Sequence, residues 1–258
     1  MPASELPKGG IVAAGPGASW LALFDPSGGA TLVEPDCPKP PGPPLLGHRE
    51  GPVLAAVDPG GRWLASGDPS GLVRLRKVAG GARCPAFRVA PSPDLGDRAV
   101  SALALSRNDL AVGLIDGGLS LWSLKGEISF EPSRTLMVHE LEITRLAFSW
   151  DGRWLASADR GGQLLLWDLA RGGNPVRLAK AVKAEALAFR EDGSELLVAD
   201  GSSGGTVDAF TLDLSRLEAL ACRAAGRDLS PSEAREFLGE DDPPRVCPDL
   251  PRGVDSGI

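Results

Sequence analysis

Histidine and cysteine, the residues that most often serve as catalytic bases, nucleophiles and metal ligands, are scarce in this 258-residue chain. It has two histidines and four cysteines, and no pair of cysteines has the C-x-x-C spacing of a zinc or redox site. A Ser-His-Asp or Cys-His site would have to use His48 or His139, and both also fit a structural role described below. Phosphate loops of the G-x-x-x-x-G-K type are absent too. We therefore expect no catalytic, cofactor-binding or metal-binding residues, no enzyme activity, and free thiols.

An excess of positive charge and a long apolar run are also missing. The formal net charge of −7 argues against a general nucleic-acid binder, because such binding depends on cations that neutralise phosphates. No stretch has the roughly 18–20 apolar residues that cross a bilayer. We therefore expect a cytoplasmic protein that binds neither nucleic acid nor membranes.

What the chain does contain is a repeat of short strands and turns. Gly-Arg-Trp-Leu-Ala-Ser occurs at 61–66 and again at 152–157, and a histidine precedes each serine by 18 residues. Related segments lie at 100–124 and 184–213, and a fifth begins near Trp20. One leucine of each copy recurs at spacings of 43, 46, 45 and 41: Leu21, Leu64, Leu110, Leu155 and Leu196. Units of this size bury their apolar faces only against neighbouring units.

The period and the closing Trp167-Asp168 resemble the WD-repeat (WD40) β-propeller family over roughly residues 11–213. The resemblance implies an all-β propeller of about five visible blades, with fourth strands at 86–90, 135–138 and 175–178. Residues 1–10 are expected to be a loose N-terminus and 214–258 a helical C-terminal cap and tail. We favour an open arc that another chain completes over a closed five-bladed ring, because residues 1–8 contain two prolines and make a poor closing strand.

The family fixes its blades with a hydrogen-bonded quartet of His, Ser or Thr, Asp and Trp. The resemblance places Gly161 and Ser70 at the aspartate positions of two blades and Arg76 at one tryptophan position, so that no quartet is complete. The remnants are His48, Ser66, Asp116, Trp122, His139, Ser157 and Trp167.

A second feature is a basic cluster on the blade at 47–90. It is either a candidate docking patch for an acidic partner or simply a solvated surface, and its members are Arg74, Arg76, Lys77, Arg83 and Arg88.

After Asp213 the apolar residues recur at helical spacing up to Gly226, and Ser230 to Glu233 form a capping box that starts a second helix. The apolar stripe of the first helix is expected to cover the edge of the last blade. Residues 217–248 resemble the tails of bacterial WD-repeat regions fused to effector domains, such as caspase-like or trypsin-like proteases, TIR domains and kinases. The matching elements are Ala221-Cys222-Arg223, Ala225-Gly226-Arg227, Leu229-Ser230, Glu233 and Cys247-Pro248.

The resemblance implies a non-enzymatic interaction or sensing module that binds a protein partner or trigger and controls or scaffolds an effector, in a bacterial defence or signalling system. Two alternatives stay open. One is a general assembly scaffold with no sensing role, and the other is a propeller hydrolase with its site in the central channel. The sequence puts Val, Ala and Leu on most strands, which disfavours the hydrolase.

Overall fold

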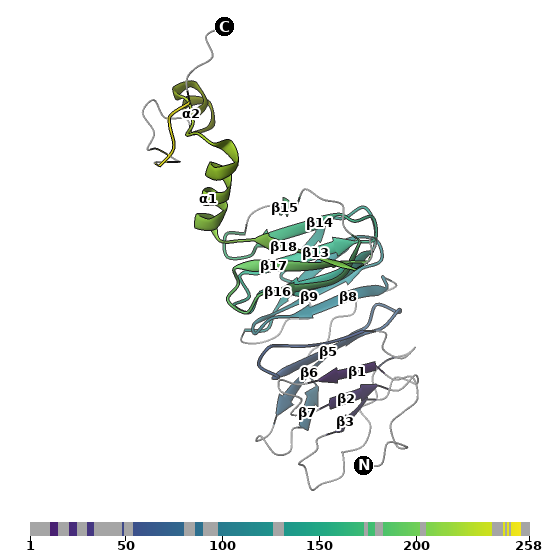
Figure 1. Ribbon diagram of the computed structural model, residues 1–258. Coiled ribbons are helices and arrows are strands. Elements are labelled where there is room, and N and C mark those ends of the chain that lie inside the picture. Colours follow the sequence, from purple (N-terminus) through teal and green to yellow (C-terminus); the bar gives the residue numbers. More distant parts are fainter. Residues whose placement is uncertain are drawn as a thin grey trace.

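The structure is a computed structural model of the full chain, and it describes residues 11–14, 21–24, 30–33, 48, 54–79, 86–89, 98–125, 132–172, 175–178, 183–201, 205–238, 245, 247 and 249–253. These residues form five antiparallel sheets followed by two helices (Figure 1). The sheets follow one another along the chain, and each is made of consecutive strands.

The sheets have three or four strands each, and their bounds are as follows. The first contains β1 (Ile11–Ala14), β2 (Leu21–Phe24) and β3 (Ala30–Val33), and the second β4 (Leu54–Val57), β5 (Trp63–Gly67), β6 (Val73–Ala79) and β7 (Ala86–Val89). The third contains β8 (Val100–Leu105), β9 (Asp109–Leu114), β10 (Gly118–Ser123) and β11 (Arg134–Met137). The fourth contains β12 (Ile143–Phe148), β13 (Trp154–Asp159), β14 (Leu164–Asp168) and β15 (Val176–Arg177), and the fifth β16 (Ala184–Phe189), β17 (Glu195–Asp200) and β18 (Thr206–Thr211). The expected all-β blade pattern is confirmed, including the fourth strands β7, β11 and β15.

Each inner sheet has two different apolar faces. We call the face that contacts the next sheet along the chain its forward face, and the opposite one its backward face. The forward face of the third sheet carries small residues on its first two strands and leucines on the third: Ala102, Ala104, Ala111, Leu119 and Leu121. It packs on a backward face of larger residues in the fourth sheet: Ile143, Leu155, Leu165 and Trp167. Small side chains on one face let bulkier ones on the other approach to close packing.

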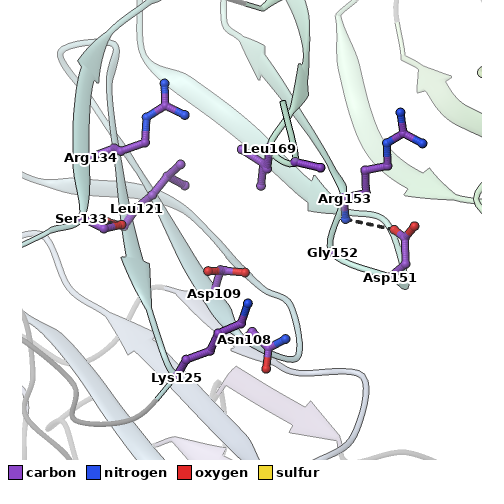
Figure 2. Close-up of a pocket in the computed structure, with 11 residues that line it drawn as sticks. Asn108, Asp109, Leu121, Lys125, Ser133, Arg134, Asp151, Gly152, Arg153 and Leu169 are labelled. Atoms are coloured by element: carbon purple, nitrogen blue, oxygen red, sulfur yellow. Dashed lines mark hydrogen bonds between the residues drawn. The ribbon is translucent and has the colours of Figure 1, made fainter. Parts of the chain in front are cut away.

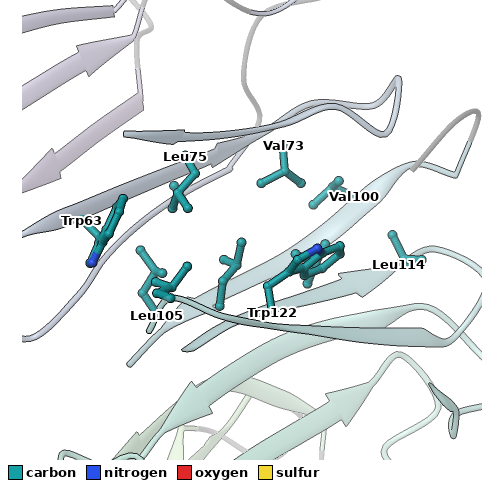
Figure 3. Close-up of a cluster of buried hydrophobic side chains, with 11 residues drawn as sticks. Trp63, Val73, Leu75, Val100, Leu105, Leu114 and Trp122 are labelled. Carbon is teal, nitrogen blue, oxygen red and sulfur yellow. The ribbon is translucent and has the colours of Figure 1, made fainter. Parts of the chain in front are cut away.

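The same pairing of faces recurs on both sides of that contact. Between the second and third sheets, Ala65, Val73 and Leu75 meet Val100, Leu105, Leu114 and Trp122, as Figure 3 shows for most of these residues. Between the fourth and fifth sheets, Ala156, Ala158, Leu164 and Leu166 meet Leu196 and Val198, with Leu187, Phe189 and Phe210 packed alongside. Apolar burial between neighbouring faces is thus what stacks the sheets.

The first strands of the sheets lie side by side in chain order: β1 contacts β4, β4 contacts β8, β8 contacts β12, and β12 contacts β16. In Figure 1, β1–β3 lie in the lower part of the molecule and β16–β18 in the upper part. The described residues therefore form an arc whose two end sheets each keep one face uncovered, as the exposure of Ala186, Ala188 and Val207 in the last sheet shows.

The C-terminal helices form as the sequence predicts, but they do not cover the last sheet. Helix α1 (Leu214–Ala225) begins at Asp213, whose side chain accepts hydrogen bonds from the N–H groups of Ser215 and Arg216, and it ends at Gly226 with a φ of 66°. Helix α2 (Pro231–Leu238) has the expected capping box. In Figure 1 both helices extend away from the sheets. Leu217 and Leu220 are 41% and 42% exposed, so the expectation that this stripe packs on the last blade is wrong.

A disulfide joins α1 to the tail, between Cys222 and Cys247. The expectation of free thiols is wrong for these two residues, because the turn after α1 and the returning tail bring their Cα atoms to 5.6 Å. The buried carboxylate of Asp228 supports the same corner by accepting hydrogen bonds from the backbone N–H of Cys247 and from the Arg245 guanidinium. Cys37 and Cys84 lie outside the described residues.

Candidate functional site

A buried polar network in the fourth sheet joins four side chains. His139, between β11 and β12, places its Nε2 2.8 Å from Ser157 Oγ on β13 and its Nδ1 3.1 Å from Asp159 Oδ2 at the end of the same strand. Trp167 on β14 donates its indole N–H to Ser157 Oγ at 3.1 Å. All four residues are at most 4% exposed. The network ties the connection before β12 to the two strands that follow it.

The residue types and a neutral ring together fix the direction of the hydrogen bonds in this network. An indole N–H can only donate, so Ser157 Oγ accepts from Trp167. A carboxylate only accepts, so His139 donates its Nδ1–H to Asp159, and the unprotonated Nε2 of the neutral ring accepts from the Ser157 hydroxyl. Burial lowers the pKa of His139 and outweighs the opposing pull of Asp159, which agrees with a neutral ring.

The second sheet repeats the network with an arginine in place of the tryptophan. His48 Nε2 lies 2.7 Å from Ser66 Oγ and His48 Nδ1 lies 2.9 Å from Asp68 Oδ2, while Arg76 donates to Ser66 Oγ at 3.0 Å. Burial lowers the pKa of His48, and it also lowers the pKa of Arg76, to about 10, with Arg74 adding to the effect. Burial alone would raise the pKa of Asp68, but hydrogen bonds from Ser70 and His48 hold it below its usual value.

The expectation that no quartet is complete is wrong, because the acidic members lie two residues after the serines and not in the turns that follow. The carboxylates come from Asp68 and Asp159, two residues after each serine, where alternate residues of a strand share a face. Gly161 and Ser70 lie in the turns beyond, and Ser70 donates to Asp68 instead of replacing it. The shared Leu-Ala-Ser-x-Asp at 64–68 and 155–159 is the sequence signal that would have identified both aspartates.

The third sheet has lost this network although it keeps the tryptophan. Val112 and Leu114 hold the strand positions that Ser157 and Asp159 hold in the fourth sheet. Trp122 is 2% exposed, and its indole nitrogen has no hydrogen-bond partner among the described residues. Asp116 is not a quartet member, since it lies in a turn and forms a partly exposed ion pair with Arg98 at 2.8 Å.

Each complete network has the atoms of a Ser-His-Asp catalytic triad, but not the accessibility that a triad requires. A serine nucleophile must reach a substrate carbonyl while its histidine takes the proton. Ser66 and Ser157 are 0% exposed, and the oxygen of each already accepts a hydrogen bond from Arg76 or Trp167. This geometry can hold a blade together, and it leaves no place for a substrate beside either serine.

The predicted basic cluster does not form one surface patch. Arg76 is 2% exposed and belongs to the buried network, so it is wrong as a docking residue. Arg74 is partly buried, whereas Lys77 is exposed and lies 5.7 Å from the centre of the Trp63 ring. Arg83 and the side chain of Arg88 lie outside the described residues.

A polar cavity of about 390 Å³ opens between the third and fourth sheets (Figure 2). Its charged lining residues are Lys125, Arg134, Arg153, Asp109 and Asp151. Arg153 is paired with Asp168 at 3.0 Å, and burial raises the pKa of Asp109. No histidine or cysteine lines this cavity, and its titratable side chains are two carboxylates, a lysine and two arginines.

The described residues contain no group of three or more His, Cys, Asp or Glu side chains placed to hold a metal ion. None of their helices has the length and apolar character needed to cross a membrane.

Comparison with known proteins supports the repeat assignment. Residues 130–168, which contain the complete network of the fourth sheet, match the family described as WD domain, G-beta repeat. The chain carries a WD repeat. Its fold is that of a WD40 propeller: it is similar to a chain in a crystal structure of the mitotic checkpoint complex, with a TM-score of 0.63 and 17% identity over 79% of this chain and 61% of that one.

A curated relative matches a smaller share of the chain. Telomerase protein component 1 of Mus musculus is 34% identical over 110 residues, which are 42% of this chain. The chain spans 4% of the length of that relative and 61% of the solved structure. WD-repeat propellers of this kind are typically non-enzymatic and support protein interaction as scaffolds.

Proposed function

We propose that this protein is a non-enzymatic interaction or sensing module, with WD-repeat blades at 11–213 and a C-terminal helical segment at 214–258 that contacts an effector. The effector is a protease, TIR or kinase protein of a bacterial defence or signalling system, on another polypeptide. The observation that carries the proposal is the exposed apolar stripe of α1, where Leu217 and Leu220 are 41% and 42% exposed on a helix that leaves the sheets (Figure 1).

Several contacts hold this stripe in place. The Asp213 and Gly226 caps fix both ends of α1, and Arg216 bonds Glu195 of the last sheet at 2.6 Å. A helix held in this way loses little conformational entropy when a partner groove covers its leucines, which favours binding.

The test compares two single substitutions on α1, each of which adds one carboxylate. Leu220→Asp changes the stripe, and Ser215→Asp changes an exposed position on the opposite side of the helix. The tagged protein is purified from the cells that encode it, the co-purifying effector is identified, and its Kd is measured by titration calorimetry. We expect Leu220→Asp to weaken binding at least tenfold and Ser215→Asp to leave it within threefold. Equal losses, or no specific partner with an effector domain, would contradict the proposal.

The general scaffold differs from the sensing module only in its effect on the effector. If the effector's activity is the same with and without saturating amounts of this chain and its trigger, the scaffold alternative is the better description. A change in activity that Leu220→Asp abolishes favours the sensing module.

The hydrolase alternative has one specific observation in its favour, the Ser-His-Asp geometry at Ser66 and Ser157. A fluorophosphonate probe labels serines of active triads. We expect the native protein to remain unlabelled, because both hydroxyls are fully buried. Labelling of either serine, abolished by His48→Ala or His139→Ala, would overturn the non-enzymatic assignment.

A cytoplasmic location is part of the proposal, and the Cys222–Cys247 disulfide provides its test. Structural disulfides persist mainly in oxidising compartments. Rapid thiol alkylation in intact cells should modify both cysteines if the protein resides in a reducing cytoplasm. Complete protection of both would place it in an oxidising compartment instead.

A further inference from the structure

The last sheet of the arc keeps an uncovered forward face with the same composition as the covered ones. Strand register places six residues on it: Ala186, Ala188, Leu197, Ala199, Val207 and Ala209. Ala186, Ala188, Val207 and Ala209 are exposed, and Leu197 and Ala199 are partly buried in the centre. Solvent thus reaches an apolar surface that presents small residues on its first strand and carries few polar side chains.

The fourth sheet shows what covers such a face. Ala158 and Leu164 are cross-strand partners in the fourth sheet, as Ala199 and Val207 are in the fifth sheet, so the two pairs hold equivalent positions. Ala158 is 0% and Leu164 1% exposed, because Leu196 and Val198 of the next sheet pack on them. Val207, at the matching position, is 65% exposed. The difference between the two faces is one missing sheet.

Among the described residues, the opposite end of the arc lacks a neighbour too. The repeated leucine of the second strand is 0% exposed at positions 64, 110, 155 and 196, and at the last three it packs in the cluster shared with the preceding sheet. In the first sheet, Leu21 is only partly buried, and its strand partner Ala14 is exposed. The arc therefore ends in a forward face without a following sheet and a backward face without a preceding one.

We propose that the forward face of β16–β18 binds a short WD-repeat segment of another polypeptide, about one to three sheets long, which stacks a backward face of Leu, Ile and Trp side chains on it. At the three junctions between the second and fifth sheets, a forward face packs on larger apolar residues of the next sheet, so the proposed contact continues an interface already present three times. Propellers close with about four to eight blades, which leaves room for at most about three beyond the five sheets seen here. The chain covers 61% of the chain of the solved structure to which it is similar.

A second copy of this chain fits less well, although its first sheet offers a suitable backward face. Two copies would bring ten sheets to one ring, above the range of about eight, and head-to-tail stacking that does not close produces open filaments. The proposal concerns a surface separate from α1, so it goes beyond the effector contact proposed above.

Photocrosslinking in the cells that encode the protein tests which molecule covers this face. The full chain carries p-benzoylphenylalanine in place of Val207 or, as a matched control, in place of Val176, a valine of β15 that is 60% exposed. We expect position 207 to crosslink to a leucine-bearing strand of a WD repeat in another polypeptide, identified by peptide mass spectrometry, and position 176 to show no such product. Crosslinks to residues 21–33 of the same chain, crosslinks to a protein without WD repeats, or no product above the control would each overturn the proposal.

Affinity for the crosslinked polypeptide provides the second measurement. Val207→Asp should weaken it at least a hundredfold, because a carboxylate would enter a position equivalent to the buried Leu164, and Ala209→Arg should act in the same direction. Val176→Asp should stay within threefold, and all three variants should keep the thermal stability of the parent. Leu220→Asp should leave this affinity unchanged, so a failed effector contact and a failed sheet contact are distinguishable.

Discussion

Trp122 and Trp167 are equivalent residues in neighbouring sheets, and they provide a direct measure of what the buried network contributes. Each is 2% exposed and each packs into an apolar cluster between sheets. Trp167 donates to Ser157 Oγ at 3.1 Å, whereas the indole N–H of Trp122 has no partner among the described residues. Replacing each by phenylalanine removes the same atoms from a similar environment. The loss of apolar burial therefore nearly cancels when the two variants are compared.

The hydrogen-bond contribution has opposite signs at the two positions. Trp167→Phe loses a buried hydrogen bond, which costs about 0.5–1.5 kcal/mol net. Trp122→Phe removes an unpaired buried donor, whose desolvation costs the folded state about 1–3 kcal/mol. Together these effects predict that Trp167→Phe lowers the free energy of unfolding by about 2–4 kcal/mol more than Trp122→Phe does.

Urea denaturation followed by far-UV circular dichroism gives the free energy of unfolding of both variants and of the parent. The slopes against urea should agree among the three proteins, so that the midpoints report stability. Equal destabilisation by the two substitutions, or a larger loss for Trp122→Phe, would refute the reasoning. It would mean that the Ser157 hydrogen bond is energetically neutral or that the Trp122 donor is satisfied.

Three further predictions concern the same networks and the tail. Burial lowers the folded-state pKa of His48 and His139 below 6.5, so the unfolded chain takes up protons at a higher pH than the folded one. The free energy of unfolding should therefore fall as pH drops below 6.5 and stay level just above it. A flat profile from pH 8 to 5 in urea titrations would exclude this. Arg76→Glu should destabilise the second sheet by about 3–5 kcal/mol, since it places an unpaired buried charge beside the Ser66 hydroxyl. Unchanged melting would contradict the buried position of Arg76. Reducing the Cys222–Cys247 disulfide should destabilise the tail by about 3 kcal/mol while the sheets keep their protection against hydrogen exchange. An equal loss of protection in the tail and in the sheets would contradict this and show that the tail supports the blades.

The blade pattern could be predicted from the sequence because it depends on local rules that repeat. Five leucines at a period near 44 and recurring turns indicate the strands directly, and the helix caps at Asp213 and Ser230 are equally local signals. The aspartates of the quartets were misplaced for a different reason. The spacing of the related motif predicts them in the turns, whereas Asp159 lies at the end of β13 and Asp68 directly after β5, each two residues after its serine.

Tertiary contacts explain the other errors. The apolar stripe of α1 indicates a buried helix, but the sequence does not say whether this chain or a partner covers it. The sequence favours a surface position for Arg76 because arginine is rarely buried, whereas in the fold it is buried and hydrogen-bonds directly to Ser66, ten residues earlier in the chain. Cys222 and Cys247 are 25 residues apart, so only the return of the tail toward α1 reveals their pairing.

The distribution of the networks along the arc separates two tasks that the repeats perform. The second and fourth sheets have complete networks, and the third has Val112 and Leu114 in their place, yet the third sheet is no less buried than its neighbours. Stacking therefore does not depend on the polar quartet, because the forward and backward faces supply it at the three junctions between the second and fifth sheets. The quartet instead fixes the connection that leads into each sheet, since its histidine is the member outside the strands. A face without a neighbour is then a stronger sign of a binding partner in this chain than a missing quartet residue, and β16–β18 present such a face.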